Sequence, residues 1–229
     1  VVDPDSIRPF EINVPDAVLV DLNERLARTR FPDELDDSDW DYGTPLSYLT
    51  ELIRYWREEF DWRVQEQRLN SFDQYKTRID DLDIHFIHQR SPEDNALPII
   101  ITHGWPGSVV EFEQIIGPLT DPVAHGGRAE DAFHVVAPSM PGYGFSEKPS
   151  SPGVNPKFIA QMRANLMTGT LGYEKFVAQG GDWGAAITTA LGTNHSDCVD
   201  SIHLTMSSTG TDVPEGVQLT ADEKKFLQH

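Results

Sequence analysis

The sequence predicts an α/β protein with a mainly parallel sheet, because short apolar segments alternate with amphipathic ones along most of the chain. The strand-like segments are runs of five or six residues, at 98–102, 133–137, 175–179 and 201–206. The segments between them repeat apolar residues at helical spacing, at 109–116, 159–170 and 185–190. A sheet of parallel strands covered by helices is the architecture that this alternation indicates.

The parallel region is preceded by a segment of different character. Residues 75–79 and 82–88 are predicted to form an antiparallel hairpin that turns at Asp80 and Asp81. We therefore expect an N-terminal segment over residues 1–90, which contains the start of this hairpin, and a second region over residues 75–229. Two helices are expected in the first segment. Their apolar stripes are Val18, Leu19, Leu22 and Leu26, and then Leu49, Leu52, Ile53, Trp56 and Phe60.

The most informative motif is Gly180-Gly181-Asp182-Trp183-Gly184, which follows a predicted strand and precedes a predicted helix. This is the G-x-Nu-x-G pattern of a nucleophile elbow, with aspartate in place of serine. An ionised carboxylate attacks carbon directly and forms an ester, which suits epoxides and alkyl halides. The alternative for this motif alone is a turn in which Asp182 caps the helix.

A second turn favours the catalytic interpretation. The segment His103-Gly104-Trp105-Pro106 follows the strand at 98–102, where an H-G-x-P turn supplies the second half of an oxyanion hole. The backbone N–H groups of Trp105 and Trp183 are the expected donors. We interpret His103, Gly104, Pro106, Gly180, Gly181 and Gly184 as residues that support the two motifs.

Composition restricts the function classes. The 229 residues carry a formal net charge of −19, which argues against a nucleic-acid partner. No apolar run is long enough to span a bilayer and no signal peptide is evident at Val1, so we expect a cytoplasmic protein without a membrane anchor. Cys198 is the single cysteine and fits a reducing compartment. The sequence leaves the oligomeric state open, and a homodimer is compatible with it.

No metal or cofactor site is expected. The acidic stretch at 33–41 lacks the glycine and spacing of an EF-hand loop. His85 and His88 are three residues apart on a strand, so they face opposite sides. The turn at 138–146 follows a strand but lacks the G-x-G-x-x-G spacing of a dinucleotide site, and we expect it to border the active site.

The motifs at 103–108, 140–146 and 180–184 resemble those of the microsomal-type epoxide hydrolases, a branch of the α/β-hydrolase superfamily. Residues 56–63, 69–70 and 84–88 resemble the N-terminal meander domain of that branch, and the likeness covers residues 6–225. The resemblance implies an α/β-hydrolase fold with an N-terminal meander. It also implies that Asp182 opens a small apolar epoxide and that a histidine-activated water then releases a diol.

The sequence departs from the family pattern after the elbow. The triad order is nucleophile, acid, histidine, yet His195, His203 and His229 do not follow late strands of a sheet. We therefore expect the cap, its two tyrosines, the acid and the histidine base to be absent from these 229 residues. Thr220 and Glu223 form a capping box for a helix that would begin just before the chain ends, which indicates a broken or truncated chain.

Two alternatives to an epoxide hydrolase stay open. A haloalkane dehalogenase would use the same Asp182, with Trp105 and Trp183 near the departing halide. A chain that truly ends at His229 could instead be a non-catalytic half-fold that serves as an interaction module.

Overall fold

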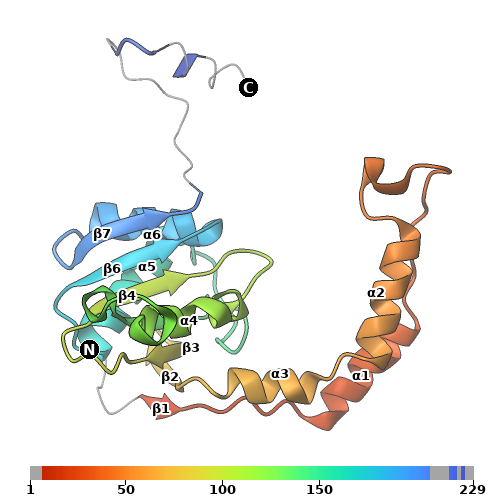
Figure 1. Cartoon of the computed structure of the whole chain (residues 1–229), viewed down its shortest axis with the longest axis horizontal. Helices are drawn as coiled ribbons and strands as arrows, with labels where there is room; N and C mark the ends of the chain where they lie inside the picture. Colours follow the sequence, from red (N-terminus) through yellow and green to blue (C-terminus); the bar gives the residue numbers. More distant parts are fainter. Residues whose placement is uncertain (1–6, 207–216, 221–222, 225–229) are drawn as a thin grey trace. The chain divides into compact units, whose positions relative to one another are not determined.

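The computed structural model describes residues 7–206, 217–220 and 223–224 (Figure 1). The chain divides into two compact units. The N-terminal unit is Pro9–Tyr75, and the sheet unit combines Val1–Arg8 with Lys76–His229.

The N-terminal unit is helical. It contains α1 (Asp16–Ala27), the 3₁₀ helix η2 (Asp39–Tyr42), α2 (Leu46–Glu58) and α3 (Trp62–Leu69). The two predicted apolar stripes do form helices, and α1 and α2 pack against each other, but neither helix buries any residue fully. Leu52 and Trp56 remain 45% and 43% exposed. The stripes of α1 and α2, with the turn into α3, instead line an apolar groove of about 910 Å³.

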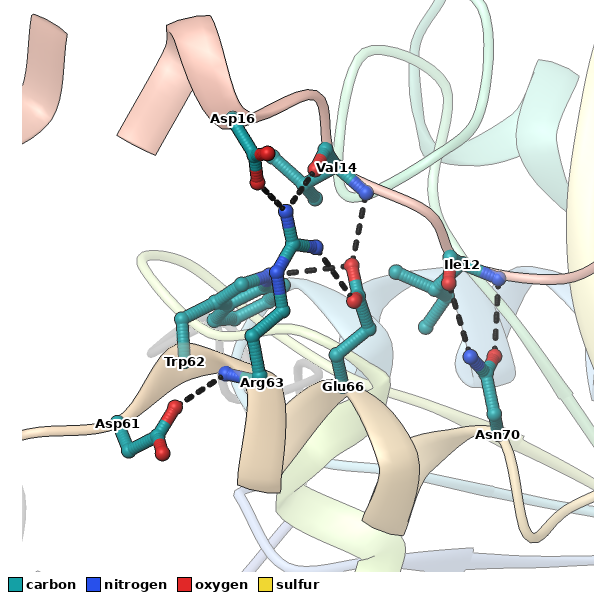
Figure 2. A network of polar contacts seen from close by, with 8 residues as sticks. All are labelled: Ile12, Val14, Asp16, Asp61, Trp62, Arg63, Glu66 and Asn70. Atoms are coloured by element: carbon teal, nitrogen blue, oxygen red, sulfur yellow. Dashed lines mark hydrogen bonds and ion pairs between the residues drawn. The ribbon is translucent and has the colours of Figure 1, made fainter. Parts of the chain in front are cut away.

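Helix α3 is tied to the extended segment before α1 by polar contacts (Figure 2). The buried Glu66 carboxylate accepts hydrogen bonds from the Val14 N–H at 2.7 Å and from the Trp62 indole N–H at 3.2 Å, and it pairs with Arg63 at 2.6 Å. Asn70 exchanges two hydrogen bonds with the backbone of Ile12, at 2.9 and 2.8 Å. The segment has no helix or long strand of its own here, so these side chains satisfy its backbone groups.

Seven strands form one sheet within the described residues, in the order β1-β2-β3-β5-β4-β6-β7. Their bounds are β1 (Arg8–Pro9), β2 (Gln74–Ile79), β3 (Leu82–Gln89), β4 (Leu97–Thr102), β5 (Phe133–Pro138), β6 (Phe176–Gly180) and β7 (Val199–Leu204). β3 pairs antiparallel with β5, whereas β4, β5, β6 and β7 are parallel to one another. The predicted hairpin turn is present, and Asp80 and Asp81 both adopt positive φ.

Helices cover both faces of the parallel strands (Figure 1). The connection from β4 to β5 contains the 3₁₀ helix η3 (Val109–Phe112) and α4 (Glu113–Thr120). The next connections contain α5 (Pro156–Ala164) and α6 (Trp183–Asn194). The strand order changes direction at β4, so right-handed crossovers place α4 on one face and α5 and α6 on the other. The core between these layers includes Ile100, Val136, Phe176 and Leu191, all fully buried.

The helix predicted at 159–170 is present, but only its first part is an α-helix. α5 ends at Ala164, and Asn165–Thr170 continues as a π-helix, η6. Apolar periodicity does not distinguish an α-helix from one with this wider turn. The last predicted strand begins at Val199, two residues earlier than the apolar run suggested.

The connection from α4 to β5 contains two short helical turns, η4 (Val123–His125) and η5 (Ala129–Asp131), whereas the link from β5 to α5, which the structure describes throughout, contains no helix or strand. The capping box is present near the end of the described chain: the Glu223 carboxylate accepts from the Thr220 N–H at 2.7 Å, and the Glu223 N–H donates to the Thr220 hydroxyl at 3.3 Å. His229 lies outside the described residues.

Candidate active site

The register of the sheet brings the two sequence motifs together. β4 and β6 are neighbours, and Thr102 at the end of β4 pairs with Gly180 at the end of β6. The turns that follow them therefore lie side by side at the carboxyl edge of the parallel strands. The direction of the strand order also reverses at β4. Ligands of open α/β sheets bind at this kind of topological switch point.

Asp182 stands at the turn between β6 and α6. It has φ 50° and ψ −126°, a conformation that is costly for any residue other than glycine. Its side chain makes no capping hydrogen bond to α6 and is exposed. The geometry therefore matches a strained strand-to-helix elbow that projects its side chain above the sheet edge, and it does not match a helix cap.

Two glycines make the close approach of these segments feasible. A Cβ on Gly184 would lie 2.0 Å from the Thr102 carbonyl oxygen, so α6 could not begin this close to β4. A Cβ on Gly104 would lie 2.5 Å from the Asp182 side chain. Gly180 and Gly181 are similarly crowded, by the Gly184 carbonyl and the Thr205 hydroxyl.

The backbone N–H of Trp105 donates a 2.7 Å hydrogen bond to Oδ1 of Asp182. This bond, followed by a hydrogen bond from the Trp183 N–H, lowers the pKa of the Asp182 carboxyl below its ordinary value. Of the two donors named from the sequence, the Trp105 N–H is the one with a defined hydrogen-bond distance to the carboxylate. Trp105 and Trp183 are themselves 66% and 53% exposed. The Trp105–Pro106 peptide bond is cis.

His103 lies beneath the first turn and does not reach the carboxylate. It is 1% exposed, and its two ring nitrogens contact the Gly104 carbonyl oxygen at 3.0 Å and the Met140 N–H at 3.1 Å. Burial is the main cause that lowers the pKa of His103, and the charge of Arg163 lowers it further. The imidazole is therefore neutral at pH 7 and is part of the turn's support.

Among the described residues, two histidines follow the elbow, and they occupy different places in the fold. His195 follows the last residue of α6, which begins at Trp183. A helix of this length separates the two ends by about 18 Å. His203 is an exposed residue within β7, opposite Gln179.

The described residues contain no group of three or more His, Cys, Asp or Glu side chains that could hold a metal ion. No helix in the same part of the chain combines the length and hydropathy of a membrane span. Cys198 is buried, and burial raises the pKa of its thiol.

Sequence reasoning did not identify Arg163. This side chain on α5 is 1% exposed and donates to the Pro138 carbonyl oxygen at 3.2 Å. Burial lowers the pKa of its guanidinium to about 9. The available signal was an arginine at helical spacing from Ile159 and Met167, on the buried side of the helix.

The fold, with its strand-to-helix turn at Asp182, is that of an α/β hydrolase. Two family models match the chain in agreement with this. One describes the epoxide hydrolase N terminus and matches residues 7–112, and the other describes the alpha/beta hydrolase fold and matches residues 98–226.

Individual proteins give the same result. A protein of Stigmatella aurantiaca with a provisional epoxide hydrolase name is 50% identical over 97% of this chain and 50% of its own length. Epoxide hydrolase 1 of Oryctolagus cuniculus is 42% identical over 89% of this chain and 45% of its own length. The structure of Aspergillus niger epoxide hydrolase matches with a TM-score of 0.80 at 34% identity, over 96% of this chain and 58% of that one.

The chain belongs to the epoxide hydrolase family of the α/β-hydrolase superfamily. It spans about half the length of the curated relatives it matches.

Proposed function

We propose that this chain contributes the nucleophile and the oxyanion hole of an epoxide hydrolase. The observation that carries the proposal is the strained elbow at Asp182, whose carboxylate is bound by the Trp105 N–H. Serine at this position would have to lose a proton to a base. A carboxylate of lowered pKa is already ionised at neutral pH and needs no base to attack carbon.

In the first step, a lone pair of Asp182 attacks one carbon of the epoxide ring and forms a C–O ester bond. The bond from that carbon to the ring oxygen breaks, and its electron pair stays on the ring oxygen, which then takes a proton from water. Because the Trp105 N–H binds Oδ1, we assign the attack to Oδ2. Oδ1 then becomes the carbonyl oxygen of the ester.

In the second step, water attacks the ester carbon after losing a proton to a base. The C=O electron pair moves to Oδ1, and the two N–H groups stabilise the resulting negative charge. When this tetrahedral species collapses, the bond between the carboxyl carbon and Oδ2 breaks. Oδ2 leaves with the substrate carbon, takes back the proton held by the base and becomes one hydroxyl of the diol, while the oxygen of the attacking water stays in the Asp182 carboxylate. One well-placed donor in such a hole contributes about 100- to 1,000-fold in rate.

The family match favours an epoxide over a haloalkane as the substrate, because the matched N-terminal model is that of epoxide hydrolases. The exposed indoles of Trp105 and Trp183 beside the carboxylate support a small apolar substrate. A detoxifying role, a cytoplasmic location and a homodimer are proposals that rest on the sequence alone.

Single-turnover labelling tests the mechanism. The protein, complete as in its source, is mixed in excess with styrene oxide in ¹⁸O-water, and the diol and the peptide with Asp182 are analysed by mass spectrometry. The ester mechanism puts the ¹⁸O into Asp182 in the first turnover and leaves the diol unlabelled. Direct attack of water on the epoxide would label the diol, and would overturn the proposal. Asp182→Asn, with a similar shape and no charge, is the matched control and should form neither ester nor diol.

A further inference from the structure

The orientation of the His103 ring is fixed by its two partners. The Met140 N–H can only donate, so Nε2 must accept at 3.1 Å. The Gly104 carbonyl oxygen can only accept, so Nδ1 must donate to it at 3.0 Å. One arrangement satisfies both contacts: a neutral ring with its proton on Nδ1. An imidazolium would lose the Met140 contact, and the other tautomer would lose both.

The Gly104 carbonyl and the Trp105 N–H belong to the same peptide unit. This unit is planar, so its C=O and N–H groups point in opposite directions and rotate together. His103 Nδ1–H holds the oxygen end, and Oδ1 of Asp182 meets the nitrogen end at 2.7 Å. A rotation of the peptide would break both bonds, so the ring that holds one end also fixes the direction of the other.

The surroundings of His103 keep the ring in place. The Tyr143 ring packs against it with centroids 5.4 Å apart. Met140, its other hydrogen-bond partner, lies in the turn after β5, and the carbonyl of Pro138, the last residue of β5, binds the buried Arg163. His103 therefore joins the turn after β4 to the turn after β5, and neither contact uses solvent.

We propose that His103 is a positioning residue that aims the Trp105 N–H at the oxygen of Asp182 that becomes negative during ester hydrolysis. The inference deepens the proposed function and rests on it for its kinetic consequence. Its structural part, a neutral Nδ1–H imidazole that orients the Gly104–Trp105 peptide, stands independently. The consequence concerns mainly the second step, because only there does Oδ1 gain a full charge.

Two substitutions separate the two contacts of the ring. The amide nitrogen of asparagine occupies roughly the position of Nδ1, so His103→Asn keeps a donor for the Gly104 carbonyl and loses the Met140 contact. The amide oxygen of glutamine reaches roughly the position of Nε2, so His103→Gln keeps an acceptor for Met140 and loses the Gly104 contact. Both variants replace a buried ring by an amide, which makes them matched controls for packing.

The first readout is the amide proton of Trp105, one of five tryptophans in residues 1–229, in ¹⁵N-tryptophan-labelled protein. In His103→Gln we expect this proton to shift upfield, since its hydrogen bond to Asp182 weakens, while the other tryptophan signals report an intact fold. In His103→Asn it should remain near the wild-type position. Equal shifts in both variants, or no shift in His103→Gln, would overturn the proposal.

The second readout separates the two chemical steps with styrene oxide, by rapid quench and intact mass. In His103→Gln, ester formation should keep its rate, while ester hydrolysis slows by about tenfold or more because a donor of the oxyanion hole is misaligned. The ester should therefore accumulate. A general loss of structure would slow both steps together, and that result would contradict a positioning role.

A measurement on the wild-type protein tests the proposal even if neither variant folds. Two-bond ¹H–¹⁵N correlation spectra of ¹⁵N-histidine-labelled protein identify the tautomer of each ring. A neutral Nδ1–H form for His103 at pH 7 is the expected result, and an Nε2–H form or an imidazolium would overturn the proposal. If the wild-type protein forms no ester with styrene oxide, the proposed function fails, while the tautomer and the Trp105 amide shift still decide the role of His103.

Discussion

Oδ1 of Asp182 accepts a 2.7 Å hydrogen bond from the backbone N–H of Trp105, a residue 77 positions earlier in the chain. The contact exists because β4 and β6 are adjacent parallel strands that end at the same level. It connects the electrostatics of the Asp182 carboxylate, the proposed nucleophile, to the geometry of a separate turn. The ionisation state of the Asp182 carboxylate is therefore the first property that experiments can check.

The lowered pKa of Asp182 predicts how ester formation depends on pH. An ordinary aspartate has a pKa of about 3.9. The two backbone N–H groups favour the ionised form of Asp182, so its pKa lies below that ordinary value. The rate of ester formation should therefore be constant from about pH 5 to about pH 8. Rapid-quench mass spectrometry with an aryl epoxide measures it, and Asp182→Asn provides the background from uncatalysed, acid-promoted labelling.

A fall of that rate with a midpoint at pH 5–6 would contradict this picture of the site. It would indicate a carboxyl with a raised pKa, which the hydrogen bond from the Trp105 N–H opposes.

The elbow itself predicts a strong effect of adding one methyl group. In Gly184→Ala the new Cβ would lie 2.0 Å from the Thr102 carbonyl oxygen, so β4 and α6 must separate. We expect a loss of about 1–3 kcal/mol in the free energy of unfolding, as is typical of overpacking, together with loss of ester formation. Urea unfolding and the mass assay measure the two effects.

Gly169→Ala is the matched control, since no atom lies within 4 Å of a Cβ built there. Its stability should stay within about 0.5 kcal/mol of the wild type, as for substitutions that meet no neighbour. Similar losses in the two variants would show that crowding at Gly184 does not explain its identity.

Much of this arrangement could be predicted from the sequence, because the motifs at 103–107 and 180–184 are local and each depends on the strand before it. Their adjacency followed from the rule that parallel strands end at one edge. The tautomer of His103 could not be predicted, since it depends on the Met140 N–H, which reaches the ring from a different turn. The burial of Arg163 and the π-helix after α5 likewise depend on packing, which the spacing of apolar residues does not reveal.

In the N-terminal unit, the sequence predicted two helices but not how exposed their side chains are. The stripes at Leu52 and Trp56 correctly predicted helices, but periodicity does not state how far such a stripe is covered, and both side chains are more than 40% exposed. α3 was not predicted as a separate helix, because its sequence is polar and its contacts with the extended segment are made by side chains such as Glu66 and Asn70.

The buried His85 predicts a specific loss of stability in acid. Burial, with a smaller effect of the Lys76 charge, lowers the pKa of this imidazole to about 3, while an unfolded histidine titrates near 6.5. Between these values the unfolded chain binds one more proton than the folded protein. The free energy of unfolding therefore rises with pH in this window and falls as the pH drops from about 6.5 towards 3, by roughly 1.4 kcal/mol per pH unit for this group.

His85→Asn isolates that contribution. The asparagine amide occupies roughly the position of Nδ1, which lies 2.9 Å from the Ser139 hydroxyl, so the variant can keep that contact without a titratable ring. Urea unfolding of both proteins between pH 4 and pH 7 should show a shallower pH dependence for His85→Asn, by about the slope of one proton. Carboxyl groups contribute equally to both curves and cancel in the difference. Parallel curves would mean that His85 is protonated in the folded protein or that the acid sensitivity arises elsewhere.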